Sequence, residues 1–357
     1  MTSWDAAAFR ASIQETLDAF LDEMTDRLEP LGPDAARLLG AARRSVSGGK
    51  RFRAAFCWWG YRAVQPDPVS EADEKALLRA CAALELLHAS ALVHDDFMDA
   101  SDTRRGRPAV HRAFEAEHRG DDWRGDPEQY GAAAAILLGD LLLSWADELL
   151  RRCGLPLERV SAALDVFDLC RSEVIAGQFL DVSAQARGHA DVDTAMTVLR
   201  YKSAKYSIER PLHVGAALAG ADADLLAELS AFGLPLGEAF QLRDDLLGVF
   251  GDAATTGKPA GDDLVEGKRT VLVALALDGA PEEEATLLDR ALGTRLSPAE
   301  VARLREVIDD SGAHGQVEAV IRELGDLALA ALDRAAVDEG ARAVLRDLAA
   351  AATDRVV

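Results

Sequence analysis

Three aspartates stand close together at the end of a long apolar stretch, in the segment HDDFMD that ends at Asp99. In a helix, Asp95 and Asp99 lie one turn apart on one face, and Asp96 lies alongside Asp99. Carboxylates this close favour a bound cation, and they suit Mg²⁺, which completes its coordination with water and substrate phosphate oxygens. The segment therefore predicts a magnesium site with these three aspartates as ligands. The alternative is a solvated acidic helix end.

A second acidic pair, Asp244 and Asp245, lies far along the chain in the segment QLRDDLLG. It also ends an apolar helix, but the position that corresponds to Asp99 is Gly248. Two such segments at the ends of two long helices predict that they face one cavity, in which Mg²⁺ bridges them to a diphosphate.

Basic residues accompany the acidic ones. In the segment GGKRFR, Lys50 and Arg53 stand at the start of a helix, where free backbone N–H groups and the helix dipole favour anions; the alternative is ordinary glycine capping with solvated cations. Arg104 and Arg105 directly follow the first acidic segment and are expected to bind two different phosphates. Single lysines beside loops are weaker candidates, because most such lysines are surface residues: Lys202, Lys258 and Lys268.

The pattern around these segments predicts helices throughout, because alanine and leucine dominate and apolar residues recur every three or four positions. The acidic segments end helices at Ser70–Asp99 and Asp222–Phe250, and Lys202 ends a helix before another begins at Tyr206. No segment alternates as a strand. Without a repeat or a linker, we expect residues 1–357 to form a single all-α domain, one large helical bundle around a central cavity.

The composition excludes several classes of protein. A net charge of -22 opposes nucleic acid or an anionic membrane surface as the main partner. The four cysteines have no paired spacing and lie in apolar stretches, as buried thiols do in a reducing compartment. The first residues lack the features of a signal peptide, and no run matches the length of a membrane span. We therefore expect a soluble cytoplasmic protein.

Together these segments resemble the trans-isoprenyl diphosphate synthases, or polyprenyl synthetases, from Gly48 to about Thr270. The matching segments are GGKRFR at 48–53, DDFMD at 95–99 with RRG after it, GQFLD at 177–181, Lys202-Ser203, QLRDD at 241–245, and TGK at 256–258 with GDDLVEGK at 261–268. The chain departs from the family pattern at Gly248, where a third aspartate is usual, and at Ser203, where threonine is usual. The resemblance implies the isoprenoid synthase fold.

The resemblance also implies a reaction. An allylic diphosphate (dimethylallyl, geranyl or farnesyl) loses its diphosphate to give a cation, isopentenyl diphosphate attacks, and a proton is lost. The product of this prenyltransferase is a trans-polyprenyl diphosphate. Three Mg²⁺ ions per active site and a homodimer packed through long apolar helices are implied as well.

The resemblance assigns roles to individual residues. The residues implied to bind isopentenyl diphosphate are Lys50, Arg53, His88 and Arg105. Those implied to bind the allylic diphosphate are Arg104, Lys202, Lys258 and Lys268. The metal ligands are Asp95, Asp96, Asp99, Asp244 and Asp245. The residues implied to stabilise the developing cation are Ser203 and Gln241, and those implied to support the site from behind are Gln178 and Asp181.

Product length depends on the helix that precedes Asp95. A growing chain is expected to follow its face past Ala91, Leu87 and Leu84, which are about one turn apart. Ser90 and Ala91 are small where family members with a fifteen-carbon product tend to carry aromatic residues. The open pocket predicts a longer product, geranylgeranyl diphosphate, with Leu87 or a bulkier residue of a neighbouring helix as its floor.

Three alternatives remain at this point. A class I terpene cyclase shares the fold and the metal chemistry but needs no site for isopentenyl diphosphate. A non-catalytic regulatory subunit of a prenyl synthase is the alternative that is not an enzyme. The third is a di-iron bundle protein, because Glu85 and His88, like Glu115 and His118, have its Glu-x-x-His spacing.

Overall fold

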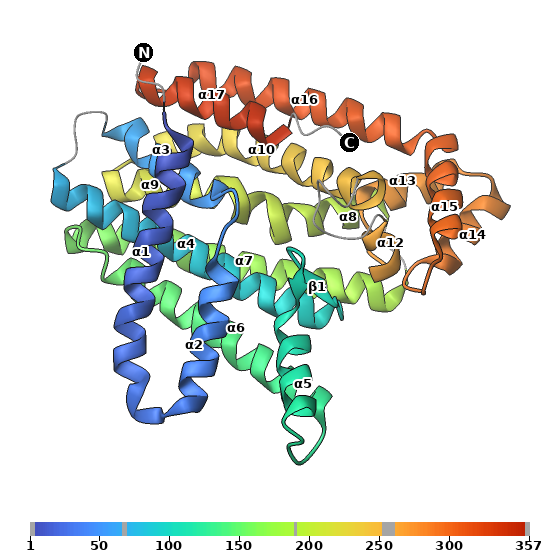
Figure 1. Cartoon of the computed structure of the whole chain (residues 1–357). Coiled ribbons are helices and arrows are strands. Elements are labelled where there is room, and N and C mark those ends of the chain that lie inside the picture. The colour runs from blue at the N-terminus through green and yellow to red at the C-terminus, as the bar shows by residue number, and fades with distance from the viewer. Residues whose placement is uncertain (1–3, 66–69, 189–190, 252–260, 354–357) are drawn as a thin grey trace. The chain divides into compact units, whose positions relative to one another are not determined.

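The computed structural model describes residues 4–65, 70–188, 191–251 and 261–353, which form helices, loops and one two-stranded hairpin (Figure 1). The all-α prediction is confirmed. The chain divides into two compact units. The first comprises Met1–Val166, Pro211–Ala221 and Asp338–Val344, and the second comprises Phe167–Arg210, Asp222–Val337 and Leu345–Val357. That the chain forms a single domain stays a prediction.

The first unit contains most of the predicted diphosphate-binding residues. Its elements are α1 (Ala6–Leu28), η1 (Glu29–Leu31), α2 (Pro33–Val46), α3 (Phe52–Val64), α4 (Glu71–Met98), β1 (Thr103–Arg104), β2 (Arg107–Pro108), α5 (Val110–Gly120), α6 (Pro127–Arg151), the first part of α7 (Leu157–Arg187), most of α9 (Arg210–Ala219) and the start of α17 (Glu339–Thr353). In Figure 1, α1 and α2 run antiparallel and are joined through η1. The sequence reading missed α5 and the hairpin of β1 and β2.

The central helix of this unit is α4, which packs against α1, α2, α3 and α6. It is the one described helix that is long and apolar enough to cross a membrane, so the expectation that no run matches a span is wrong for α4. However, 72% of its apolar window is buried, as in the core helix of a soluble protein. Near the acidic end of α4, a Cβ at Gly139 of α6 would lie only 2.1 Å from His94 Nε2. The lack of a side chain at this glycine lets α6 lie directly against α4.

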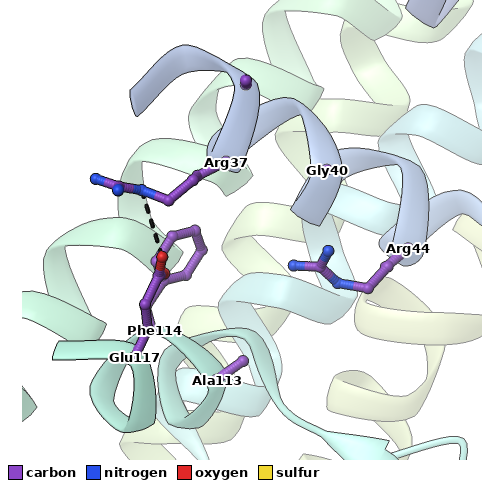
Figure 2. Close-up of a pocket in the computed structure, with 7 residues that line it drawn as sticks. Arg37, Gly40, Arg44, Ala113, Phe114 and Glu117 are labelled. Atoms are coloured by element: carbon purple, nitrogen blue, oxygen red, sulfur yellow. Dashed lines mark ion pairs between the residues drawn. The ribbon is translucent and has the colours of Figure 1, made fainter. Parts of the chain in front are cut away.

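A surface pocket of about 420 Å³ lies between α2 and α5 (Figure 2). Arg37 of α2 and Glu117 of α5 form an ion pair beside it, with a distance of 3.4 Å between Arg37 Nε and Glu117 Oε1. The predicted site residues are absent from the lining of this pocket, which is made by Ala36, Arg37, Gly40, Arg44, Ala113, Phe114 and Glu117. The ion pair connects the helix before the GGKRFR segment to the helix after the hairpin.

The second unit is built around α10. Its elements are the rest of α7, α8 (Val192–Val198), η2 (Leu199–Glu209), α10 (Ala223–Phe250), α12 (Asp262–Glu266), α13 (Val271–Gly279), α14 (Glu282–Ala291), α15 (Pro298–Asp310), α16 (Ala313–Arg334) and the end of α17. The sequence reading missed α12. Buried Arg243 of α10 donates to Glu318 of α16 with two guanidinium nitrogens and to the carbonyl of Thr353. This ion pair fixes α10 against the C-terminal helices of the same unit.

The predicted break between Lys202 and Tyr206 is wrong, because these residues lie within the continuous π-helix η2. Two glycines bring their helices close to η2. A Cβ at Gly177 of α7 would lie 2.4 Å from the backbone nitrogen of Lys202, and one at Gly237 of α10 would lie 2.5 Å from the carbonyl oxygen of Ala204. Packing from both sides maintains a helix where the local sequence indicates a boundary.

Candidate active site

The first acidic segment forms the C-terminal end of α4. Asp99 caps the helix, and its backbone N–H donates to the carbonyl of Asp95 at 2.8 Å. Ala100 adopts a left-handed conformation (φ 52°), and the N–H of Ser101 donates to the carbonyl of Asp96 at 2.9 Å. These contacts end the helix as a Schellman motif does. Asp95 and Asp99 therefore lie on its last turn, as the sequence predicted.

The three aspartates have different surroundings. Asp96 is buried and accepts hydrogen bonds from Arg104 Nε, at 2.8 Å, and Arg104 Nη2. Arg104 Nη2 also lies 3.9 Å from Asp95 Oδ2. One carboxylate oxygen of Asp95 and one of Asp99 are buried, although both residues remain partly exposed. In this arrangement Asp96 orients Arg104, whereas the prediction that Asp96 binds metal stays untested.

The hairpin after α4 sends its two arginines in different directions. Strands β1 and β2 are joined by Arg105 and Gly106, both with positive φ (52° and 71°), which is typical of a type I′ turn. Arg104 reaches Asp96, whereas Arg105 Nη1 donates to the carbonyl of Ser47 at 2.9 Å. A Cβ at Gly49 would lie 3.1 Å from Arg105 Nη2. The hairpin therefore places Arg105 against the GGKRFR segment.

The GGKRFR segment differs from the expected open helix start. Arg51 adopts a left-handed conformation (φ 57°) as the N-cap of α3, so exposed Lys50 precedes the helix and is not one regular turn from Arg53. The backbone N–H of Ala54, in the first turn, donates to Glu85 Oε1 at 3.3 Å. Lys50 therefore lies outside α3 rather than in its first turn as expected, and α4 supplies a carboxylate to the start of α3. The sequence alone did not indicate a role in the synthase site for Arg51 or Glu85. A glutamate inside the apolar run of α4 is, however, a signal that this residue has such a role.

Half-buried His88 lies at the centre of a cluster of arginines. Burial holds its pKa well below the usual range, and the positive charges of Arg53, Arg105, Arg104 and Arg51, in that order, lower it further. His88 is therefore neutral at physiological pH, and the surrounding guanidinium groups provide the positive potential that a diphosphate requires.

The carboxylates of the second acidic segment have different surroundings from those of the first. Gln241 Nε2 donates to Asp245 Oδ1 at 2.8 Å, one turn along α10. Burial raises the pKa of Asp245 to about 8, and the nearby charge of Asp263 acts in the same direction. Asp245 is therefore mostly protonated at neutral pH, while Asp244 is partly exposed.

At Gly248 the space of the missing third aspartate is occupied. A Cβ at this position would lie 1.9 Å from Asp263 Oδ2, a carboxylate at the start of α12. Lys268 Nζ lies 3.3 Å from Asp263 Oδ1 and 2.6 Å from Glu266 Oε2. Asp263, which the sequence reading gave no role of its own, thus brings Lys268 near the second acidic segment. Lys258 lies outside the described residues.

Lys202 and Asp181 are neighbours across η2 and α7, with Lys202 Nζ 2.5 Å from Asp181 Oδ2. Asp181 is buried, so it restricts the position of Lys202. Gln178 Nε2 is buried as well, and no acceptor lies within hydrogen-bond distance among the described residues. Ser203 follows Lys202 within the π-helix and is half-buried.

The residues predicted to set product length lie on α4. Leu84, Leu87 and Ser90 are at most 3% exposed, and Ala91 is half-buried. All four precede the acidic end of the same helix. Three of the four are thus buried in the first unit, and their role in product length stays a prediction.

The candidate metal ligands suit Mg²⁺ better than a metal ion that takes all its ligands from the protein. Among the residues that the structure describes, no three His, Cys, Asp or Glu side chains gather in a group that could hold a metal ion. Mg²⁺ needs only one or two carboxylates when substrate phosphates and water complete its shell, and Asp95 and Asp99 offer this kind of donor. The di-iron alternative is not supported, because Glu85 binds Arg51 and Glu115 binds Arg112 and Arg119.

Residues 36–310 match the family model for polyprenyl synthetase. The chain belongs to the polyprenyl synthetase family. This polyprenyl synthetase is similar in structure to a geranylgeranyl pyrophosphate synthase from Corynebacterium glutamicum, solved with isoprenyl diphosphate and magnesium. The two share 42% identity and a TM-score of 0.96, over 99% of this chain and 100% of that one.

Two curated relatives of this polyprenyl synthetase carry other product names. A geranylfarnesyl diphosphate synthase from Natronomonas pharaonis is 31% identical, over 88% of this chain and 87% of that protein. A (2E,6E)-farnesyl diphosphate synthase from Mycobacterium tuberculosis is 32% identical, over 96% and 91%. The protein is therefore a prenyltransferase that elongates trans-prenyl chains, rather than a terpene cyclase or a regulatory subunit.

Proposed function

We propose that this polyprenyl synthetase condenses isopentenyl diphosphate with an allylic diphosphate to form geranylgeranyl diphosphate, with Mg²⁺ as its cofactor. The main supporting observation is the set of arginines around neutral His88, next to the acidic end of α4. The positive charge of these arginines suits a second diphosphate, beside the diphosphate that Mg²⁺ binds. The similar structure from Corynebacterium glutamicum, named for the same product, contains magnesium and isoprenyl diphosphate.

Isopentenyl diphosphate would bind to Lys50, Arg53, His88 and Arg105. Arg53 and Arg105 lie close enough to His88 to lower its pKa. A neutral imidazole can donate a hydrogen bond to a phosphate oxygen without adding charge. Arg105 is fixed by the carbonyl of Ser47, so it is preorganised for this task.

The allylic diphosphate would bind to Arg104, Lys202, Lys258 and Lys268, and to Mg²⁺ on Asp95, Asp99 and Asp244. When bound, Mg²⁺ neutralises the charge that develops on the leaving diphosphate. Asp96 and Asp245 remain candidate ligands, although Asp96 binds Arg104 and Asp245 accepts from Gln241. By resemblance to the family, we propose that three Mg²⁺ ions bind in each site.

The allylic cation would be stabilised by the hydroxyl or carbonyl of Ser203 and by the amide of Gln241. The hydrogen bond to Asp245 restricts the Gln241 amide, and Asp181 restricts Lys202. Oriented dipoles of this kind stabilise developing positive charge without reorganising during the reaction. We propose that Gln178 and Asp181 support these groups without contacting substrate.

The reaction is tested by incubating the purified protein with labelled isopentenyl diphosphate, each allylic primer in turn, and Mg²⁺. The dephosphorylated products are then separated by chromatography. We expect elongation to twenty carbons, and loss of elongation in the presence of EDTA. Absence of elongation with every primer would contradict the proposed function.

Product length is tested on α4. Ser90→Phe adds a bulky side chain where Ser90 is small and buried, so products should shorten. Leu87→Ala removes volume from the expected floor, so products should lengthen. If neither variant shifts the distribution, the floor lies elsewhere.

We propose a homodimer in the cytoplasm. The homodimer is supported by exposed apolar side chains on a long helix of each unit. On α6, Ile136 and Leu137 are exposed, and on α7, Ile175 and Phe179 are exposed, Phe179 by 70%. Large exposed apolar side chains in a series favour a protein interface. Sedimentation equilibrium should give twice the chain mass, and Phe179→Asp should shift the equilibrium toward the monomer.

A further inference from the structure

Arg51 and Glu85 form a buried ion pair within the first unit. Arg51 Nη1 donates to Glu85 Oε2 at 2.9 Å, and each side chain is only 4% exposed. Burying two opposite charges adds little net stability compared with an apolar pair of similar size. The pair therefore calls for a reason other than stability.

Glu85 connects α4 to the start of α3. Its second carboxylate oxygen, Oε1, accepts from the backbone N–H of Ala54 at 3.3 Å, in the first turn of α3. A carboxylate at this place satisfies a free backbone donor and interacts favourably with the helix dipole. Because Glu85 accepts from this N–H, the backbone donor of Ala54 is not available to a substrate phosphate.

Arg51 connects the start of α3 to α1 and α2. Its Nη2 donates to Gln14 Oε1 of α1, at 2.7 Å, and to the carbonyl of Val46 at the end of α2. Gln14 Oε1 also lies 3.4 Å from the backbone nitrogen of Gly48, which donates to it. Three helices thus hold the segment through one buried guanidinium group.

Residues 47–53, the segment that Arg51 and Glu85 hold, lie next to the groups that are expected to bind isopentenyl diphosphate. His88 follows Glu85 by three residues on α4, so both lie on neighbouring turns. Arg105 contacts the segment at Ser47 and Gly49. A shift of residues 47–53 would therefore move Arg53 relative to His88 and would release Arg105.

We propose that Glu85 is a positioning residue that fixes residues 47–53, through Arg51 and the start of α3, and so sets the affinity for isopentenyl diphosphate. The allylic substrate depends on it much less, because Arg104 is fixed separately by Asp96. This inference rests on the proposed function, because it presumes that isopentenyl diphosphate binds at His88 and the surrounding arginines.

The main test is Glu85→Gln, which preserves the shape of the side chain and removes its charge. The KM for isopentenyl diphosphate should rise about tenfold, while kcat and the KM for the allylic primer change less than about twofold. The matched control is Glu74→Gln, an exposed glutamate on α4, which should change neither KM. An unchanged KM for isopentenyl diphosphate, or a parallel rise of both KM values, would overturn the proposal.

A second variant covers the case in which Glu85→Gln fails to fold, because it leaves Arg51 buried without a balancing charge. Gln14→Met removes the acceptor shared by Arg51 and Gly48 at a half-buried position. It should raise the KM for isopentenyl diphosphate about threefold, again without a change for the allylic primer. An unchanged value in this variant also overturns the proposal.

Direct binding separates this inference from the proposed function. Isothermal titration of isopentenyl diphosphate into the wild-type protein without a primer should show binding, and Glu85→Gln or Gln14→Met should weaken it by the same factor as the KM. If the wild-type protein neither binds nor elongates isopentenyl diphosphate, the proposed function fails. If the wild-type protein does both and the folded variants equal it, only the role of Glu85 fails.

Discussion

Asp96 and Asp245 are the second aspartates of the two acidic pairs, and both are buried, yet their surroundings differ. Asp96 accepts two hydrogen bonds from the Arg104 guanidinium, which balances its charge. Asp245 accepts from the neutral amide of Gln241 and lies near Asp263, and burial raises its pKa to about 8. The same dipeptide thus supplies a charged anchor in one unit and a mostly neutral acid in the other.

The difference shows that the sequence of an acidic pair does not determine its ionisation. A buried carboxylate stays ionised when a cation compensates for the lost hydration, and otherwise it retains its proton. The third position differs as well. Asp99 ends α4, whereas Gly248 leaves room for Asp263.

The largest expected effect comes from Asp96→Asn. The amide still accepts a hydrogen bond but no longer balances Arg104, so the free energy of unfolding should fall by about 3 kcal/mol and the KM for the allylic primer should rise about tenfold. Urea denaturation and steady-state kinetics measure these changes. The control is Asp102→Asn, because its side chain is 78% exposed and binds Arg112 at the surface. Equal effects of both variants would contradict an anchoring role for Asp96.

A smaller effect is expected from Gly248→Ala. The new Cβ would lie 1.9 Å from Asp263 Oδ2, so Asp263 and the nearby Lys268 must move. The free energy of unfolding should fall by about 2 kcal/mol, and the KM for the allylic primer should rise. Gly325→Ala in α16 is the matched control, because a Cβ there would meet no described atom within 4 Å apart from its chain neighbours and the backbone of its own helix. If both variants behave alike in denaturation, Asp263 does not fill the space at Gly248.

At about pH 4 the smallest effect of the three is expected from Asp245→Asn, because its amide resembles the protonated acid. The wild-type carboxyl has a pKa of about 8 when folded, above the ordinary value of 3.8 for an aspartate. Its contribution to stability is therefore complete below about pH 4 and is lost as the pH rises toward 8. Measured in EDTA, the stability of Asp245→Asn relative to wild type should increase by up to about 1.4 kcal/mol per pH unit across this range. A difference that does not change with pH would show that Asp245 is ionised in the folded protein.

Much of the site was predictable because its residues are close in sequence. The spacing of Asp95 and Asp99 placed them on one turn at the end of α4, and the adjacent Arg104 and Arg105 were expected to serve different phosphates. The hairpin sends them to different protein partners, Asp96 and the carbonyl of Ser47, while their binding to phosphates stays a prediction. Periodicity also predicted the long helices α4 and α10 to within a residue or two at each end.

The failures concern contacts between segments distant in sequence. The ion pair of Arg51 with Glu85 spans 34 positions, so no local pattern indicated that α3 would be capped from α4. The continuous π-helix at Lys202 depends on the close approach of Gly177 and Gly237. Local propensity cannot register such packing, which overrides it.

The sequence by itself determined the all-α class, the family and the residue types that can bind Mg²⁺ and diphosphate, because these depend on composition, periodicity and short spacings. Only the tertiary structure decided which carboxylates carry charge and which basic groups are held in place. Asp96 and Glu85 each have a guanidinium partner, Arg104 or Arg51, whereas Asp245 has a neutral partner in Gln241, and burial and the nearby charge of Asp263 raise its pKa. Burial makes that partner decisive, because a carboxylate removed from water depends on the groups that replace its hydration.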